Sequence, residues 1–203
     1  MSGESCARLQ ARGGWAEDAL EQRCGWPIAP RNTWSNLAYP LAGAYLVSVD
    51  PSRSAWVLAV ALAVLGVGSA LYHGLKTRWA NKLDWVGMYL VFGSLGIHGI
   101  DPANPGTPAA MIVTAVLVAG LFSYVVPNVS LEVQMGVLLW FSAVPGVLAG
   151  HSAQVALGMG AFVVAFGAWH ADRRRFVVGK WGHALWHILT AFAIPTIFLA
   201  QGR

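Results

Sequence analysis

The sequence predicts an all-α membrane protein built as a seven-transmembrane helix bundle. Only 11% of the 203 residues are charged, whereas a soluble domain carries about 25%. Four long windows contain no Asp, Glu, Lys or Arg, at 54–75, 85–100, 102–131 and 133–171. A helix needs about 20 apolar residues to cross the hydrocarbon of a bilayer. The last window is therefore long enough for two crossings, with a turn at Gly150-His151-Ser152.

Seven spans account for these windows and their flanks. The chain then divides into a polar amino-terminal segment, residues 1–31, and a seven-transmembrane domain, residues 32–203. Pro27 and Pro30 discourage a helix in the first part, and Asn32-Thr33 is a suitable helix start. Prolines within the spans are expected to kink them, namely Pro40, Pro145 and Pro195. The expected spans are 33–49, 54–75, 83–100, 108–127, 132–149, 153–171 and 181–200.

The basic residues predict the orientation in the membrane. The amino-terminal segment and the connections 2–3, 4–5 and 6–7 share one side, which holds eleven of the 13 Lys and Arg. The positive-inside bias places this side, and the amino terminus, in the cytoplasm. The net charge of +4 therefore reflects membrane orientation, and we expect no nucleic-acid partner. Tryptophans expected near this boundary are Trp15, Trp26, Trp79 and Trp181.

The first 31 residues also bear on targeting and redox state. They lack an apolar core, so we expect no cleavable signal peptide, and the first span would act as the insertion signal. Two cysteines, Cys6 and Cys24, lie outside the apolar windows. Because two cysteines make no disulfide framework, we expect free thiols.

Five polar residues stand out in this apolar chain: Ser69, His73, Asp84, His183 and His187. Ser69 and His73 are four residues apart, as are His183 and His187, so each pair shares one face of a helix. Under the predicted topology His73, Asp84 and the two late histidines all fall near the cytoplasmic face. Ionisable groups at membrane depth are costly and are candidates for function.

Three histidines at one depth indicate a catalytic zinc site. Such sites have three protein ligands and one water, and zinc lowers the pKa of that water toward about 7. Asp84 could deprotonate the water, or it could orient a histidine. We favour the first role, because Ala184 stands where a His-Glu-x-x-His motif would supply a base. Ser69 could donate a hydrogen bond to the oxyanion.

Simpler interpretations exist for single residues. Ser69 could bond the carbonyl four residues before it, and Asp84 could cap the third span. His98 and His151 lie toward the opposite face by the same topology, and His170 is expected at the interface, next to Asp172 and the arginines that follow it.

The order and spacing of these residues resemble a known superfamily. Ser-x3-His, an aspartate eleven residues later and a late His-x3-His are similar to motifs of alkaline ceramidases, progestin and adiponectin receptors and GPI-remodelling lipid hydrolases. Residues 32–36, Asn-Thr-Trp-Ser-Asn, and 182–190, Gly-His-Ala-Leu-Trp-His-Ile-Leu-Thr, look like the ceramidase branch. The resemblance implies zinc on His73, His183 and His187, with Asp84 and Ser69 beside the metal water. It also implies hydrolysis of the amide of a ceramide-like lipid to a long-chain base and a fatty acid.

The chain departs from that family in two ways. Eukaryotic members carry an acidic amino-terminal cluster that binds calcium. Here Glu17, Asp18 and Glu21 are acidic, but Ala29 stands where those members have a glutamate, so we do not expect calcium. Eukaryotic ceramidases have a lumenal amino terminus, unlike the cytoplasmic one predicted here. Short connections indicate a bacterial inner-membrane protein, whose substrate could be another lipid amide or ester.

Two other functions remain open from the sequence. One is a receptor-like or haemolysin-like seven-helix protein in which the zinc is structural. The other is a transporter whose histidines relay protons, although we find no inverted repeat of broken helices.

Overall fold

Helices account for the regular structure of the part of the chain that can be described. The computed structural model describes residues 25–100, 143–144, 147–148, 150–173 and 181–201, which contain no strand. Of the predicted spans, 108–127 and most of 132–149 lie outside these residues, as do both cysteines. The helices are α3 (Pro30–Ser35), α4 (Ala38–Val49), α5 (Arg53–Leu75), α6 (Arg78–Ile100), α9 (Ser152–Arg173) and α10 (Gly182–Gln201).

Three of these helices are long and apolar enough to cross a membrane: α5, α9 over Ser152–Asp172, and α10. Their outward faces carry large apolar side chains, among them Val60 on α5, Val163 on α9 and Phe192 on α10. Extended apolar surfaces of this kind mark contact with a membrane or a partner. The described part of the chain is therefore all-helical and consistent with a membrane protein, while the count of seven spans stays a prediction.

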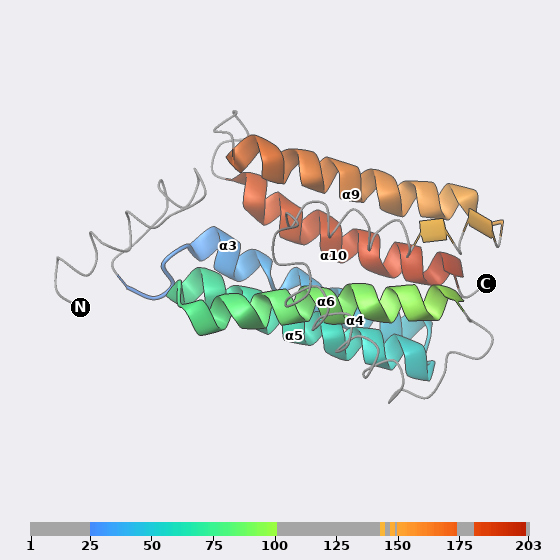
Figure 1. Ribbon diagram of the computed structural model, residues 1–203, viewed down its shortest axis with the longest axis horizontal. Coiled ribbons are helices and arrows are strands. Elements are labelled where there is room, and N and C mark those ends of the chain that lie inside the picture. The colour runs from blue at the N-terminus through green and yellow to red at the C-terminus, as the bar shows by residue number, and fades with distance from the viewer. Residues whose placement is uncertain (1–24, 101–142, 145–146, 149, 174–180, 202–203) are drawn as a thin grey trace, which may run out of the picture.

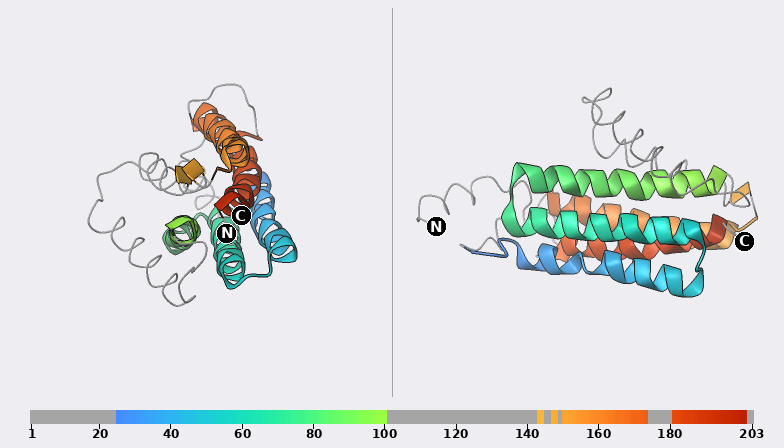
Figure 2. Two further views of the ribbon diagram at one scale, coloured as in Figure 1. Left: turned by 90° about the vertical axis from the view of Figure 1, so that its right-hand side faces the viewer. Right: turned by 90° about the horizontal axis from the view of Figure 1, so that it is seen from below.

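The long helices lie side by side along the long axis of the molecule (Figures 1 and 2). Helix α5 packs against both α4 and α6, and α10 packs against α9 while also contacting α3, α4 and α6. The end of α5, the start of α6, the start of α10 and α3 all lie at the same end of the bundle (Figure 1). Residues far apart in the sequence are thereby brought to one place.

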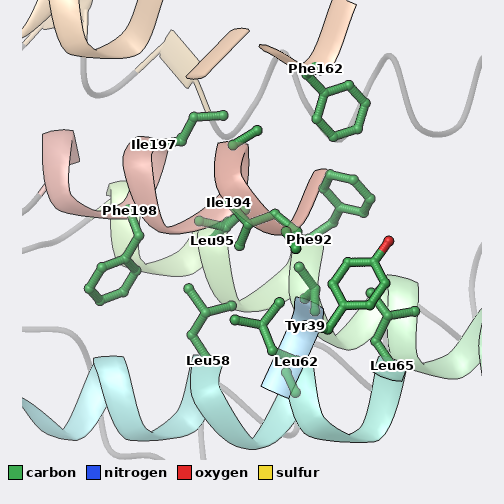
Figure 3. Packing of buried hydrophobic residues seen from close by; sticks show 14 of the residues in the cluster. Tyr39, Leu58, Leu62, Leu65, Phe92, Leu95, Phe162, Ile194, Ile197 and Phe198 are labelled. Atoms are coloured by element: carbon green, nitrogen blue, oxygen red, sulfur yellow. The ribbon is translucent and has the colours of Figure 1, made fainter. Parts of the chain in front are cut away.

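Aromatic and aliphatic side chains fill the space between the helices. Phe162 of α9 contacts Phe92 of α6 and Trp186 of α10 edge-on, with ring centroids 5.9 and 5.3 Å apart. In lipid such close packing, more than water exclusion, holds helices together. Figure 3 shows the side chains converging, with Tyr39, Leu58, Leu62, Leu65, Phe92, Leu95, Phe162, Ile194, Ile197 and Phe198 labelled.

Two glycines allow α5 and α6 to approach closely. A Cβ atom at Gly87 would lie 2.5 Å from Cα of Leu65, and one at Gly68 would lie 2.9 Å from the backbone of Leu83 and Asp84. Real Cβ atoms essentially never come that near to backbone atoms. The register of α5 on α6 therefore depends on these glycines, and it sets Ser69, next to Gly68, beside Asp84.

The first predicted span is not one helix. It was expected at 33–49, but the chain forms α3, a turn at Asn36-Leu37, and then α4. Pro40 has no N–H to donate to the carbonyl of Asn36, so an uninterrupted helix is disfavoured there. The N–H of Tyr39 bonds that carbonyl instead, at 3.2 Å. Pro30, expected to discourage a helix, is the first residue of α3, a position where its missing N–H costs nothing.

The third predicted span begins earlier than expected. Helix α6 starts at Arg78 rather than at residue 83, so most of the predicted connection 76–82 is helical. Asp84 is therefore the seventh residue of α6, nearly two turns from its start. It does not cap the helix, and the simpler interpretation of this residue as a cap was wrong.

Other predicted boundaries agree with the structure within two residues. The turn before α9 is present, with Gly150 at a φ of +88° that favours glycine. Helix α5 begins after Ser52, whose side chain accepts a hydrogen bond from the N–H of Ala55 at 3.2 Å. Of the prolines expected to kink spans, Pro195 lies inside α10, which continues through it, and Pro145 lies outside the described residues.

Adding a side chain at Gly87 should loosen the packing of α5 on α6. We expect Gly87→Val to lower the free energy of unfolding by about 1–3 kcal/mol, because the new atoms overlap backbone rather than a movable side chain. Thermal unfolding in detergent measures the change. Gly96→Ala in the same helix is the control, since its Cβ would meet no described atom within 4 Å. Equal stability of the two variants would contradict the close approach.

Candidate metal centre

Three buried histidines from two helices meet at one end of the bundle. His73 lies near the end of α5, and His183 and His187 lie in the first two turns of α10. One ring nitrogen of each lies within 4.8 Å of the other two. The ring centroids are 4.6 Å apart for His73 and His183, 5.2 Å for His73 and His187, and 4.7 Å for His183 and His187. The predicted convergence of the three rings is present, and together they could bind a metal ion.

The spacing of the nitrogens fits a shared cation. Nε2 of His73 and Nε2 of His183 are 3.1 Å apart. Two imidazoles on one tetrahedral zinc place their nitrogens about 3.3 Å apart, because each Zn–N bond is about 2.0–2.1 Å long. Imidazole nitrogen suits zinc and several other first-row metals. The donor set therefore fits a transition metal and does not by itself select one.

Asp84 and Ser69 face the same space as the histidines. A pocket of about 250 Å³ is lined by all five predicted site residues: Ser69, His73, Asp84, His183 and His187. The hydroxyl of Ser69 is hydrogen-bonded to the carboxyl group of Asp84. Because α5 and α6 touch at Gly68, this bond follows directly from helix packing. The site thus combines three nitrogen ligands, one carboxyl group and one hydroxyl.

Aromatic side chains form much of the remaining pocket wall. Tyr39, Tyr72, Trp85, Trp169 and Trp186 line it. The hydroxyls of Tyr39 and Thr190 are 2.8 Å apart and link α4 to α10. Leu65 and Met88 add apolar surface to the wall, and Asn81 adds a polar side chain.

His187 makes a hydrogen bond to a side chain outside the three-histidine cluster. Its Nδ1 lies 2.8 Å from Oγ of Ser35, at the end of α3. Metal-binding histidines commonly hold their second ring nitrogen in such a contact, which fixes the orientation of the ring. This contact leaves Nε2 of His187 as the nitrogen available to the centre.

His73 has a different neighbour. Nζ of Lys76 lies 3.4 Å from Nδ1 of His73 and also 4.9 Å from the ring centroid of Tyr72. An ammonium group only donates hydrogen bonds, whereas a histidine that ligates through Nε2 carries its hydrogen on Nδ1. The two arrangements exclude each other, so the flexible Lys76 side chain must turn away when a cation is bound.

The remaining histidines lie outside the cluster, and His98 and His151 lie toward the opposite end of the bundle, as the topology predicted. His98 stacks on Phe198 near the end of α10, with centroids 3.9 Å apart. Phe198 lies fifteen residues after His183, about 22 Å along the helix at 1.5 Å per residue. His151 precedes α9 at that same end of the bundle, and His170 packs against Phe166 and Trp169. None belongs to the three-histidine cluster.

A scan against protein-family models and a search of the curated proteins found no match. The resemblance to alkaline ceramidases, drawn from short motifs, therefore stays a prediction. Function must be inferred from the chemistry of the site.

Among the side chains near the site that sequence reasoning missed are Ser35, Tyr39 and Lys76. Ser35 had a signal, since it lies in the 32–36 motif that resembles ceramidases, but no role was assigned to it. Lys76 was counted only for membrane orientation, and Tyr39 was not singled out. Contacts between residues 151 or 152 positions apart, as for Tyr39 with Thr190 and Ser35 with His187, leave no periodic pattern in a single sequence.

Removing one histidine should abolish tight metal binding. Loss of a hydrogen bond that supports a ligand lowers metal affinity about 10–100-fold. Because His187→Ala removes the ligand itself, we expect its metal affinity to fall further than that. Competition with a chromogenic chelator in detergent measures this. His98→Ala, which removes a buried histidine at the other end, should keep its metal. Unchanged affinity in His187→Ala would exclude this residue as a ligand.

Removing the charge of Lys76 should strengthen metal binding. In Lys76→Met a cation near the centre is replaced by an apolar chain of similar length, so we expect affinity to rise roughly twofold to tenfold, a range set by partial solvent screening. The same chelator competition detects the change. Lys82→Met, an exposed lysine of α6, is the control, and weaker binding in Lys76→Met would mean that the lysine supports the site.

Proposed function

We propose that this protein is an intramembrane zinc-dependent hydrolase that cleaves the amide bond of a ceramide-like lipid, releasing a long-chain base and a fatty acid. The observation that carries the proposal is one pocket lined by three converging imidazoles, a carboxyl group and a hydroxyl. An ion held for structure alone is usually closed by four protein ligands. Three nitrogens beside an acid–base group favour catalysis instead.

The metal of this proposal is zinc, one of several metals that the donor set fits. When bound by three histidines it keeps one position for water, makes that water acidic near neutral pH and polarises a carbonyl oxygen. In this proposal His73 supplies one ligand from α5, and His183 and His187 supply two from successive turns of α10.

Asp84 is the proton carrier in the proposed reaction. Its carboxylate accepts a proton from the attacking water as the oxygen adds to the amide carbon. The carboxylic acid then gives that proton to the nitrogen, so the C–N bond breaks and a free amine leaves with a carboxylic acid as co-product. Ser69 donates its one hydrogen to the carboxylate of Asp84 and orients it. Once Asp84 holds the proton, the hydroxyl is free to donate to a developing oxyanion.

The position of the pocket suits a lipid amide. Exposed tryptophans surround this end of the bundle: Trp26, Trp79 and Trp181. Indole rings favour the headgroup region of a bilayer, which supports a pocket just below the headgroups, where the linkage of a lipid lies. The cytoplasmic side of a bacterial inner membrane is the proposed location, on the strength of the basic residues counted above.

Asp84→Asn should separate metal binding from turnover. We expect this variant to keep its zinc, because no ligand is changed, and to lose at least about 10²-fold in turnover, the usual contribution of a general base. Metal analysis of the purified protein measures the zinc content, and mass spectrometry of ceramides and other lipid amides incubated with it measures the turnover. Asp50→Asn, at the opposite end of α4, should behave as wild type.

Other outcomes identify the competing functions. Full turnover in Asp84→Asn would remove this residue as the base. A zinc-loaded wild-type protein that is stabilised by zinc but cleaves no lipid amide or ester would favour a receptor-like protein with a structural site. A protein that binds no metal but carries protons in liposomes would be a transporter.

A further inference from the structure

The contact between Ser35 and His187 has a direction that can be read from the neighbouring atoms. Oγ of Ser35 lies 2.8 Å from Nδ1 of His187 and donates to the carbonyl oxygen of Asn32 at 3.2 Å. A serine hydroxyl has one hydrogen. With that hydrogen on the carbonyl of Asn32, the serine oxygen accepts a hydrogen from Nδ1 of His187. The ring of His187 is also hydrogen-bonded to the backbone of Asn32, and a carbonyl oxygen only accepts, which favours the same direction. The neutral ring then presents its lone pair at Nε2, toward the other two histidines.

The carbonyl of Asn32 is held in place by the turn between α3 and α4. It is one of the last four carbonyls of α3, which a helix leaves without N–H donors of its own. The side-chain amide of Asn36, in the turn that separates α3 from α4, also donates to it, at 2.5 Å. Asn32 and Asn36 are each only 1% exposed. The break in the first predicted span thus builds a rigid acceptor behind Ser35.

The residues just before α3 are also hydrogen-bonded to the end of α5, the helix that carries His73. The N–H groups of Ile28 and Ala29 donate to the carbonyls of Gly74 and His73, both at 3.1 Å. One short segment, residues 28–36, therefore contacts the backbone of one histidine and the side chain of another. This arrangement fixes the distance between α5 and α10 at the centre.

We propose that Ser35 is a positioning residue that holds His187 in the Nδ1–H tautomer, with Nε2 directed at the metal. The inference rests on the three-histidine centre of the proposed function but not on the reaction or the substrate. It gives a role to the Asn-Thr-Trp-Ser-Asn motif, in which Asn32 and Asn36 support the serine that supports the ligand.

The test measures metal affinity and ligand geometry rather than turnover. We expect Ser35→Ala to lose about 10–100-fold in zinc affinity and to broaden or shift the visible absorption of the cobalt-substituted protein. Ser35→Thr keeps the hydroxyl and should restore both. Ser48→Ala is a matched control, because Ser48 is an exposed serine of α4 that bonds the carbonyl three residues before it, at 2.7 Å, as Ser35 does.

Nitrogen-15 NMR of labelled histidine in the metal-free protein provides the second measurement. The His187 signal, assigned by its absence in His187→Ala, should report Nδ1–H in the wild type and a mixture of tautomers in Ser35→Ala. Wild-type metal affinity and an unchanged cobalt spectrum in a folded Ser35→Ala would overturn the proposal. Equal losses in Ser35→Ala and Ser35→Thr, with an unchanged tautomer, would also overturn it.

These results can be told apart from failure of the proposed function. If the wild type binds zinc but cleaves no lipid, the hydrolase fails while the role of Ser35 is still decided by affinity and spectrum. If lipid is cleaved and Ser35→Ala binds zinc normally, the hydrolase stands and Ser35 is only a packing contact.

Discussion

The closeness of three imidazole rings in an apolar helix bundle is the constraint on which this structure depends. Each neutral ring has one nitrogen with a lone pair, and one ring nitrogen of each histidine lies within 4.8 Å of the other two. Burying unsatisfied polar groups is costly, and more so in lipid. A single cation accepts three lone pairs at once. The contact of Nδ1 of His187 with Ser35 turns one of them toward the centre, whereas Lys76 must leave Nδ1 of His73 before a second can face it.

Helix packing converts this constraint into a reactive site. Glycine contacts bring α5 and α6 together so closely that Ser69 and Asp84 become hydrogen-bonding neighbours. The four-residue spacing on α10 turns His183 and His187 to the same side. The acid and the ligands come from different helices, so their separation is set by backbone contacts, which move less than flexible side chains do.

The sequence allowed the helical class and the five site residues to be predicted, because apolar windows and four-residue spacings are local signals. It also gave the bounds of α5, α9 and α10 to within two residues. The kink expected at Pro40 takes the form of the break between α3 and α4, because the missing N–H of Pro40 affects a carbonyl four residues earlier. That α3 is a separate helix was not predicted. The early start of α6 was missed because charged residues at 76–82 were taken as a connection. Ser35 and Lys76 acquire their roles only through tertiary contacts, which a single sequence does not display.

The hydrogen bonds from Ile28 and Ala29 to the last carbonyls of α5 have a consequence for the order in which the molecule comes apart. Helix ends normally fray, because their last carbonyls have no N–H partner within the helix and bond water instead. Here the end of α5 is tied to a segment more than forty residues earlier in the chain. Fraying of α5 at His73 therefore requires the stretch before α3 to detach as well. The end of α5 and the stretch before α3 therefore form one cooperative unit. Amide protons in both should exchange with solvent at a common rate.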